Sequence, residues 1–313
     1  MPAAEQARGN ANVINRWIKT TRNLQTTSHG PGFVLSLMVL SGSLIASAAK
    51  GSEKTFESDP NPRITLTNIS GQVVIRGWDK PQVRVVYEVM SPRVEVDTEL
   101  LPAGGSAASR FRFATHVLDP LVTGKDETVD YSLDVPAGAS LEIRNPQGSV
   151  QLARLQGGDV SVESVGGSIA VSDFNGHLFL RSVGGNIEAI RPNGRVEAYS
   201  ITGSLHIVSP ATSKLRGTTT SGRILFEGDF ADGGEYSLSA YSGDIDIFCP
   251  PSASFELNAK TVRGKLENEM PMTIRHRQAT PLSSANSLFG TRNTGKATLN
   301  LTSFSGKIRI RER

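Results

Sequence analysis

Two acidic side chains are the first candidates for chemistry. Asp246 and Glu267 each stand third after a glycine, Gly243 and Gly264, in two similar segments. If these segments are neighbouring rungs of one stacked β-structure, the carboxylates lie about 5–5.5 Å apart, a separation that suits acid–base cleavage of a glycosidic bond. Two acidic side chains on an exposed strand are more often simply solvated. A polysaccharide-acting enzyme is therefore an alternative that rests on this pair alone.

The histidines give weaker candidates. Glu188 and His206 occupy equivalent positions in successive repeats, so we expect them to be neighbours, but no serine or cysteine column completes a nucleophilic set beside them. His29, His116 and His276 show no metal-ligand spacing such as H-E-x-x-H. The sequence predicts no catalytic residue, no metal site and no cofactor.

A short repeat positions these residues. A glycine recurs nearly every nine residues through the middle of the chain, and the second and fourth residues after it are apolar everywhere except at Asn268. Self-similarity at a fixed period is typical of repeat architectures. The repeat glycines are Gly148, Gly158, Gly167, Gly176, Gly185, Gly194, Gly203, Gly222, Gly243, Gly264 and Gly306.

Pairs of these repeats form a longer unit. The similar segments Ser164–Ile169, Ser182–Ile187 and Ser200–Leu205 lie 18 residues apart, so two nine-residue halves make one coil with two different turns. Stacked coils would pair each strand with its equivalents about 4.8 Å above and below, with alternate side chains pointing inward. We therefore predict an all-β fold, a β-solenoid of the β-helix or β-roll kind, with coils of about 18–21 residues. Glycine would supply a positive φ at the turns.

The outward positions are the candidate binding surface. Their side chains are mixed in charge, which favours solvation over a uniform ice-, calcium- or glycan-binding ladder. Calcium binding would need the pattern G-G-x-G-x-D, and the residues after Gly166-Gly167 and Gly184-Gly185 lack its third glycine and aspartate. Equivalent positions predict a charge ladder of Arg223, Asp244 and Lys265, with about 0.2–1 kcal/mol for each opposite pair. The candidate binding residues are Glu188, His206, Arg223, Asp244, Asp246, Lys265 and Glu267.

The N-terminal segment predicts export. Residues 1–49 combine basic side chains, the apolar run Phe33–Ile45 and the small residues Ala46-Ser47-Ala48, as a secretory signal peptide does. The run is short for a membrane span of about 20 residues. We expect cleavage, with an uncleaved N-terminal anchor as the alternative and the only link to a membrane. Cys249 is the only cysteine, so no intrachain disulfide forms.

The rest of the chain divides into two connected regions. Residues 50–130 form an N-terminal β region, because Arg63–Val89 alternates apolar and polar residues. Its looser stretch, Ser91–Asp126, reads as an excursion or hairpin arm. Residues 131–313 form the continuous repeat array. Beyond residue 48 the chain carries equal numbers of basic and acidic residues, which argues against nucleic-acid binding.

The repeats resemble the bacterial putative-adhesin family, a domain of unknown function on envelope proteins. The resemblance covers roughly residues 60–313. It is carried by Leu66–Asp79, by Tyr131–Ile143, and by the S-G-x-I-x-I signature in Tyr241–Pro251 and Phe304–Ile310. The resemblance implies a right-handed solenoid on an exported protein and brings no catalytic residues.

The expected function is non-catalytic. A rigid side wall would bind a polysaccharide or a protein of the cell envelope, in the periplasm or at the cell surface. The alternatives are the polysaccharide-acting enzyme and the sensory domain of an envelope-stress system.

Overall fold

The structure is a computed structural model that describes residues 50–102, 108–118, 127–274 and 286–313. The chain divides into two units, Met1–Ser47 and Ala48–Arg313, and the described residues all lie in the second. The predicted signal segment and His276 fall outside the described residues. In the part of the chain that the structure describes, no helix is long and apolar enough to span a membrane.

The all-β prediction is confirmed, since the described residues form a 22-stranded sheet and no helix. The strands are β1 (Lys50–Thr67), β2 (Val73–Trp78), β3 (Gln82–Val89), β4 (Val94–Pro102), β5 (Ala108–Val117), β6 (Val129–Pro136), β7 (Ser140–Arg144), β8 (Val150–Ser164), β9 (Ile169–Ser182), β10 (Ile187–Ile190), β11 (Asn193–Ser200), β12 (Leu205–Val208), β13 (Ala211–Thr219), β14 (Ile224–Glu227), β15 (Glu235–Ala240), β16 (Ile245–Cys249), β17 (Phe255–Thr261), β18 (Leu266–Asn268), β19 (Thr273–Ile274), β20 (Asn286–Arg292), β21 (Ala297–Ser303) and β22 (Ile308–Glu312).

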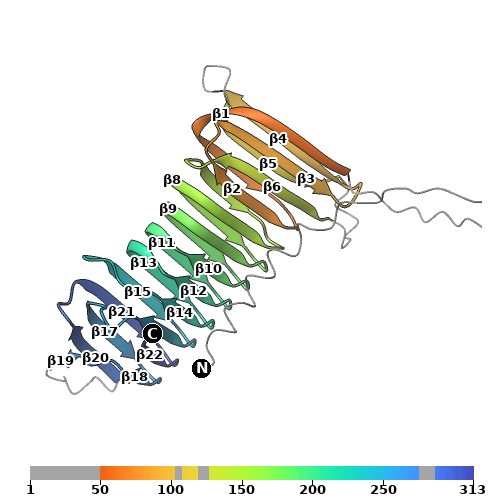
Figure 1. Cartoon of the computed structure of the whole chain (residues 1–313). Helices are drawn as coiled ribbons and strands as arrows, with labels where there is room; N and C mark the ends of the chain where they lie inside the picture. The colour runs from red at the N-terminus through yellow and green to blue at the C-terminus, as the bar shows by residue number, and fades with distance from the viewer. Residues whose placement is uncertain (1–49, 103–107, 119–126, 275–285) are drawn as a thin grey trace, which may run out of the picture. The chain divides into compact units, whose positions relative to one another are not determined.

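The middle of the chain forms two parallel ladders joined by turns (Figure 1). The first ladder runs β2–β8–β9–β10–β12–β14–β16, and the second runs β7–β8–β9–β11–β13–β15. The long strands β8 and β9 contribute one half to each ladder. Register follows the repeat, because Ile187 lies opposite Ile169 and Leu205, one 18-residue coil away on either side.

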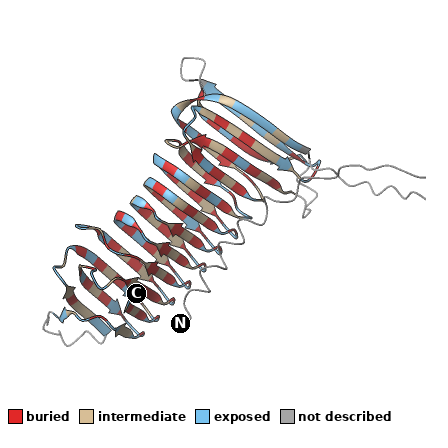
Figure 2. Cartoon of the chain, in the orientation of Figure 1, coloured by how far each residue is buried: buried red, intermediate tan, exposed pale blue. Residues whose placement is uncertain are grey.

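The core lies between the two ladders. Alternation along the strands places one side chain inside and the next outside, and Figure 2 shows this as alternating buried and more exposed bands. All the repeat positions predicted to point inward are buried except Leu266, which is half-buried, and Asn268, which is exposed. Both exceptions lie on β18, an outer strand of the stack.

The turn glycines serve two purposes. The expected positive φ is confirmed at Gly176 and Gly194, where φ is 144° and 94°. At Gly167 and Gly185 it is wrong, because neither glycine has a positive φ. There a Cβ atom would lie 1.7–1.8 Å from the glycine carbonyl oxygen of the preceding coil. Close backbone approach between coils therefore requires glycine at this turn.

The N-terminal region departs from the repeat. The first part of β1 pairs with β3 in antiparallel register, whereas Arg63–Thr67 pairs in parallel with both β5 and β7. Strands β4 and β5 form an antiparallel pair within the described part of Ser91–Asp126. Strands β2 and β7 continue into the two parallel ladders through β8.

The C-terminal coil lies out of sequence order. Strand β21 pairs with β15 on one side and β17 on the other, and β22 lies in the same way between β16 and β18. The chain leaves the stack after β18, forms β19 and β20 antiparallel to each other and adds β20 to the outer edge of β17. It then returns to the inner edge of β17, where β21 pairs with it. The charged segment Arg309–Arg313 lies largely within β22, which pairs with β16 on one side and with β18 on the other.

Candidate functional site

Asp246 is a buried carboxylate held by two arginines. Its side chain is 1% exposed, and it accepts hydrogen bonds from Arg223 Nε at 2.5 Å and from Arg309 Nη2 at 2.9 Å. Arg309 Nε also donates to Asp246, and Arg309 Nη2 donates to Asp244 at 2.9 Å. The hydrogen bond to Asp246 is the main cause that raises the pKa of Arg309. The cluster joins three coils.

This cluster corrects the predicted carboxylate pair. Arg309 lies directly opposite Asp246 on one side and Glu267 on the other, so the two acids are two rungs apart. The prediction that they are neighbours is wrong because the C-terminal coil inserts between their strands. The two arginines cover the carboxylate of Asp246. This carboxylate therefore serves to hold neighbouring coils together through buried ion pairs.

The predicted charge ladder is corrected by the same insertion. Lys307 stands just before β22 of the inserted coil, and in the stack it lies between Asp244 and Lys265. Its backbone N–H donates to Asp244 Oδ1 at 2.9 Å. Asp244 therefore supports the turn of the next coil, and Lys265 has no acidic neighbour directly opposite in this column.

His206 lies between two carboxylates. Its Nδ1 is 3.3 Å from Glu188 Oε1, so the predicted neighbour pair is confirmed. Its Nε2 is 3.2 Å from Glu227 Oε1, on the coil at the other side. Glu227 was missed because the residue directly opposite His206 is Leu225, and the contact to Glu227 is diagonal.

The second ladder carries a cluster that sequence reasoning did not single out. Glu197 accepts hydrogen bonds from Tyr199 Oη and Arg195 Nε, both at 2.9 Å, and its Oε1 lies 3.5 Å from His177 Nε2. The bond from Tyr199 is the main cause that lowers the pKa of Glu197. His177 and Phe179 also line a shallow hollow of about 240 Å³.

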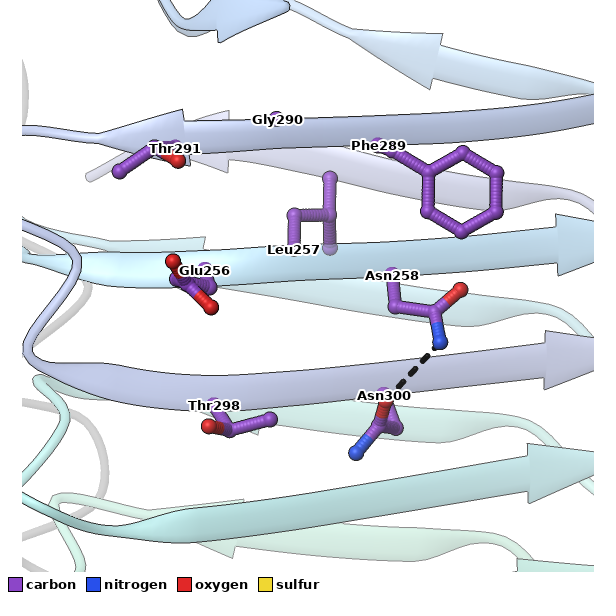
Figure 3. A pocket seen from close by; sticks show the side chains of 8 residues that line it. All are labelled: Glu256, Leu257, Asn258, Phe289, Gly290, Thr291, Thr298 and Asn300. Carbon is purple, nitrogen blue, oxygen red and sulfur yellow. Dashed lines mark hydrogen bonds between the residues drawn. The ribbon is translucent and has the colours of Figure 1, made fainter. Parts of the chain in front are cut away.

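A polar groove lies where the second ladder meets the displaced C-terminal strands (Figure 3). It has a volume of about 240 Å³ and is formed by β17, β20 and β21. Asn258 Nδ2 donates to Asn300 Oδ1 at 3.2 Å, and the Phe289 ring lies at the same end of the groove. The groove is lined by Glu256, Leu257, Asn258, Phe289, Gly290, Thr291, Thr298 and Asn300. No sequence signal could show it, because it depends on β21 lying beside β17.

The seven predicted binding residues all lie on the first ladder or at its turns, but they do not converge on one site. Lys265 and Glu267 share a hollow of about 550 Å³, which β18 forms with Ile274 of β19 and Asn286–Leu288 of β20. Among the described residues, no group of three or more His, Cys, Asp or Glu side chains is placed to hold a metal ion.

Comparison with known proteins bears on the C-terminal part of the chain. Residues 199–311 match the family described as Toastrack DUF4097. No curated protein matches the chain.

Two solved structures are similar over most of the length. A putative cell adhesion protein from Clostridium sporogenes ATCC 15579 is 10% identical, with 84% of this chain and 100% of that chain covered and a TM-score of 0.24. A putative adhesin from Parabacteroides distasonis ATCC 8503 is 11% identical, with 85% and 98% covered and a TM-score of 0.37. The family match over residues 199–311 confirms the resemblance that was inferred from the repeat segments.

Proposed function

We propose that this chain is a non-catalytic binding protein of the putative-adhesin type, which presents its ladders as a rigid side wall to an envelope polysaccharide. The polar groove of Figure 3 is the observation that carries the proposal. Its amide, hydroxyl and carboxylate groups can donate and accept hydrogen bonds with sugar hydroxyls. The Phe289 ring adds apolar surface at one end of the groove, beside the Lys260 ammonium, which lies 5.5 Å from the ring centroid.

Rigidity favours binding at this groove. Its side chains stand on three strands that are hydrogen-bonded in register, β20 to β17 and β17 to β21. Because the backbone is already ordered, a ligand does not have to immobilise a loop, and less affinity is lost to conformational entropy.

The stacked coils support a finer description of the fold. We take residues 131–313 as a right-handed β-solenoid with coils of 18–21 residues, interrupted by the displaced C-terminal strands. The parallel one-coil register supports this. The right hand follows from the strong preference for right-handed crossovers between parallel strands.

The proposal also includes export of the protein from the cytoplasm. The pattern of residues 1–49 supports delivery to the periplasm, the envelope or the cell surface. A side wall for recognition would then face envelope polymers.

The test is a binding screen of the full chain against a glycan array and purified envelope polymers, at about 0.15 M salt to limit non-specific attraction. The double variant Asn258→Ala/Asn300→Ala should weaken binding to the recognised glycan by at least tenfold, through loss of about 1.4 kcal/mol or more of hydrogen bonding. Asn175→Ala changes an exposed asparagine of β9, a strand that does not line the groove, and is the matched control.

Three outcomes would count against the proposal. Equal binding by the double variant and the control would show that the groove is not the site. Binding to no glycan would indicate that the ligand of the side wall is a protein and not a polysaccharide. Release of shortened glycan by the wild-type chain would show catalysis and contradict a purely binding role.

A further inference from the structure

One turn of most coils carries an apolar side chain that is exposed or half-buried. Each follows the residue that ends a second-ladder strand, and together they form a column that we call the apolar ridge. The exposed fractions are 59% for Tyr241 and 39–54% for the aliphatic members, and Phe304 is half-buried. In spatial order the ridge consists of Val165, Val183, Ile201, Tyr241, Phe304 and Val262, with Thr220 between Ile201 and Tyr241.

Backbone hydrogen bonds hold the ridge in register. The carbonyl oxygen of Val165 accepts from Gly184 N at 2.7 Å, and that of Val183 accepts from Thr202 N at 2.9 Å. The carbonyl oxygen of Phe304 accepts from Arg263 N at 2.7 Å. Six steps of about 4.8 Å give a ridge of roughly 29 Å. Its apolar side chains are therefore fixed in a line before any partner arrives.

The aromatic end of the ridge presents ring edges. The insertion of the C-terminal coil places Phe304 beside Tyr241, with ring centroids 4.8 Å apart and planes at 3°. The Arg263 guanidinium lies 5.2 Å from the Phe304 centroid. The two rings thus cover each other on their stacked sides, while 59% of Tyr241 stays exposed. Apolar edges beside a tyrosine hydroxyl and a guanidinium suit the boundary between lipid chains and headgroups.

The charges beside this end are mainly basic. Lys260 precedes the last turn, Arg263 lies within it, and Lys265 and Lys307 follow two adjacent turns, and all four are exposed. The nearby acid Asp244 is already paired with Arg309. The ridge therefore combines apolar side chains with cations, a combination complementary to an anionic lipid surface.

We propose that the apolar ridge docks on an anionic lipid bilayer, with Tyr241, Phe304 and Val262 in the headgroup boundary and the four cations among the phosphates. This is a membrane contact by the folded β unit itself and not by the N-terminal segment. Lys260 also contacts Phe289, at the edge of the polar groove. A second copy of the chain is the competing occupant, because two ridges share the same spacing.

A fluorescent label on the ridge reports docking directly. In the full chain, Val262→Cys carries an environment-sensitive dye, and Ala211→Cys, at the opposite turn, is the control position. Cys249 is buried and does not compete for the label. Mixed phosphatidylcholine–phosphatidylglycerol vesicles should shift the emission of the dye at position 262 to shorter wavelength and leave position 211 unchanged. The contrast holds even if the N-terminal segment tethers the chain, because the dye reports only its own surroundings.

Charge variants test the second half of the proposal. In the Val262→Cys background, Lys265→Gln and Lys307→Gln should each weaken the vesicle-dependent shift about fivefold in apparent affinity. Lys214→Gln and Arg216→Gln, on the second-ladder face, should have no effect. Vesicles of phosphatidylcholine alone should give little shift.

Two results would overturn lipid docking. The first is a dye at position 262 that does not respond to anionic vesicles. The second is a shift that depends on protein concentration without vesicles, which would assign the ridge to a second copy of this chain.

Discussion

Residues 150–249 and residues 255–312 share one repeat, yet they stack differently. In the first region each coil except the last lies between its neighbours in the sequence, as the register of β10 with β9 and β12 shows. In the second region the last coil of the chain lies between two earlier ones. The repeat therefore determines which residues align across a ladder, but it leaves open which coil is the neighbour.

The energetic difference between the regions follows from burial. Repeat positions in the middle region are covered by coils on both sides, whereas β18 pairs only with β22 among the described strands. The most informative experiments compare matched changes in the two regions.

The largest effect should come from a charge in the middle core. Ile187 is fully buried, so Ile187→Asp places an unpaired carboxylate between the ladders and should lower the free energy of unfolding by several kcal/mol. Leu266→Asp, at the equivalent position of half-buried β18, should cost much less. Thermal melts followed by circular dichroism give both values. Equal losses would show that the two regions are equally enclosed.

The next largest effect should come from the ion-pair cluster that joins the regions. Asp246→Ala leaves Arg309 without its main partner and should cost about 3–5 kcal/mol in urea unfolding. Asp173→Ala, in the exposed pair with Arg191 of the middle region, should cost about 0–1 kcal/mol. A small loss in Asp246→Ala would contradict the role of this cluster as an anchor.

Coil order can be tested by crosslinking. Tyr241→Cys with Phe304→Cys should form a disulfide under mild oxidation, because neighbouring strands lie about 4.8 Å apart, and it should stabilise the fold by about 2–4 kcal/mol. Tyr241→Cys with Val262→Cys should not crosslink, since a coil lies between them. The reverse pattern, read by non-reducing electrophoresis and mass spectrometry, would restore the sequence order of coils.

The smallest effect should appear at alkaline pH. Burial raises the pKa of Cys249, at the joint between the regions, from 9.0 to about 12. The unfolded thiol loses its proton first, so stability is complete below about pH 9 and declines as the pH rises toward 12. Urea midpoints measured across this range should fall less steeply in Cys249→Ala. Burial also raises the pKa of Tyr131 to about 12. The stability of Cys249→Ala should therefore still decline with rising pH, but less than that of the unmodified chain.

The binding surface was only partly predictable. Glu188 and His206 were correctly placed as neighbours because both belong to coils in sequence order. Asp246 and Glu267 were wrongly paired, and the groove at Asn258 and Asn300 was missed, because both depend on the inserted coil. The repeat predicts which side chains are neighbours on a ladder only where the coils stack in the order of the sequence.

The sequence by itself determined the all-β class, the inward columns and the register, because spacing and apolar alternation act between adjacent residues. It also marked Gly167 and Gly185 as turns, although not the reason for glycine there. Only the tertiary structure decided the coil order. A coil with the same apolar face can be buried equally well at either edge of a stack, so its place depends on where β19 and β20 carry the chain before β21 returns.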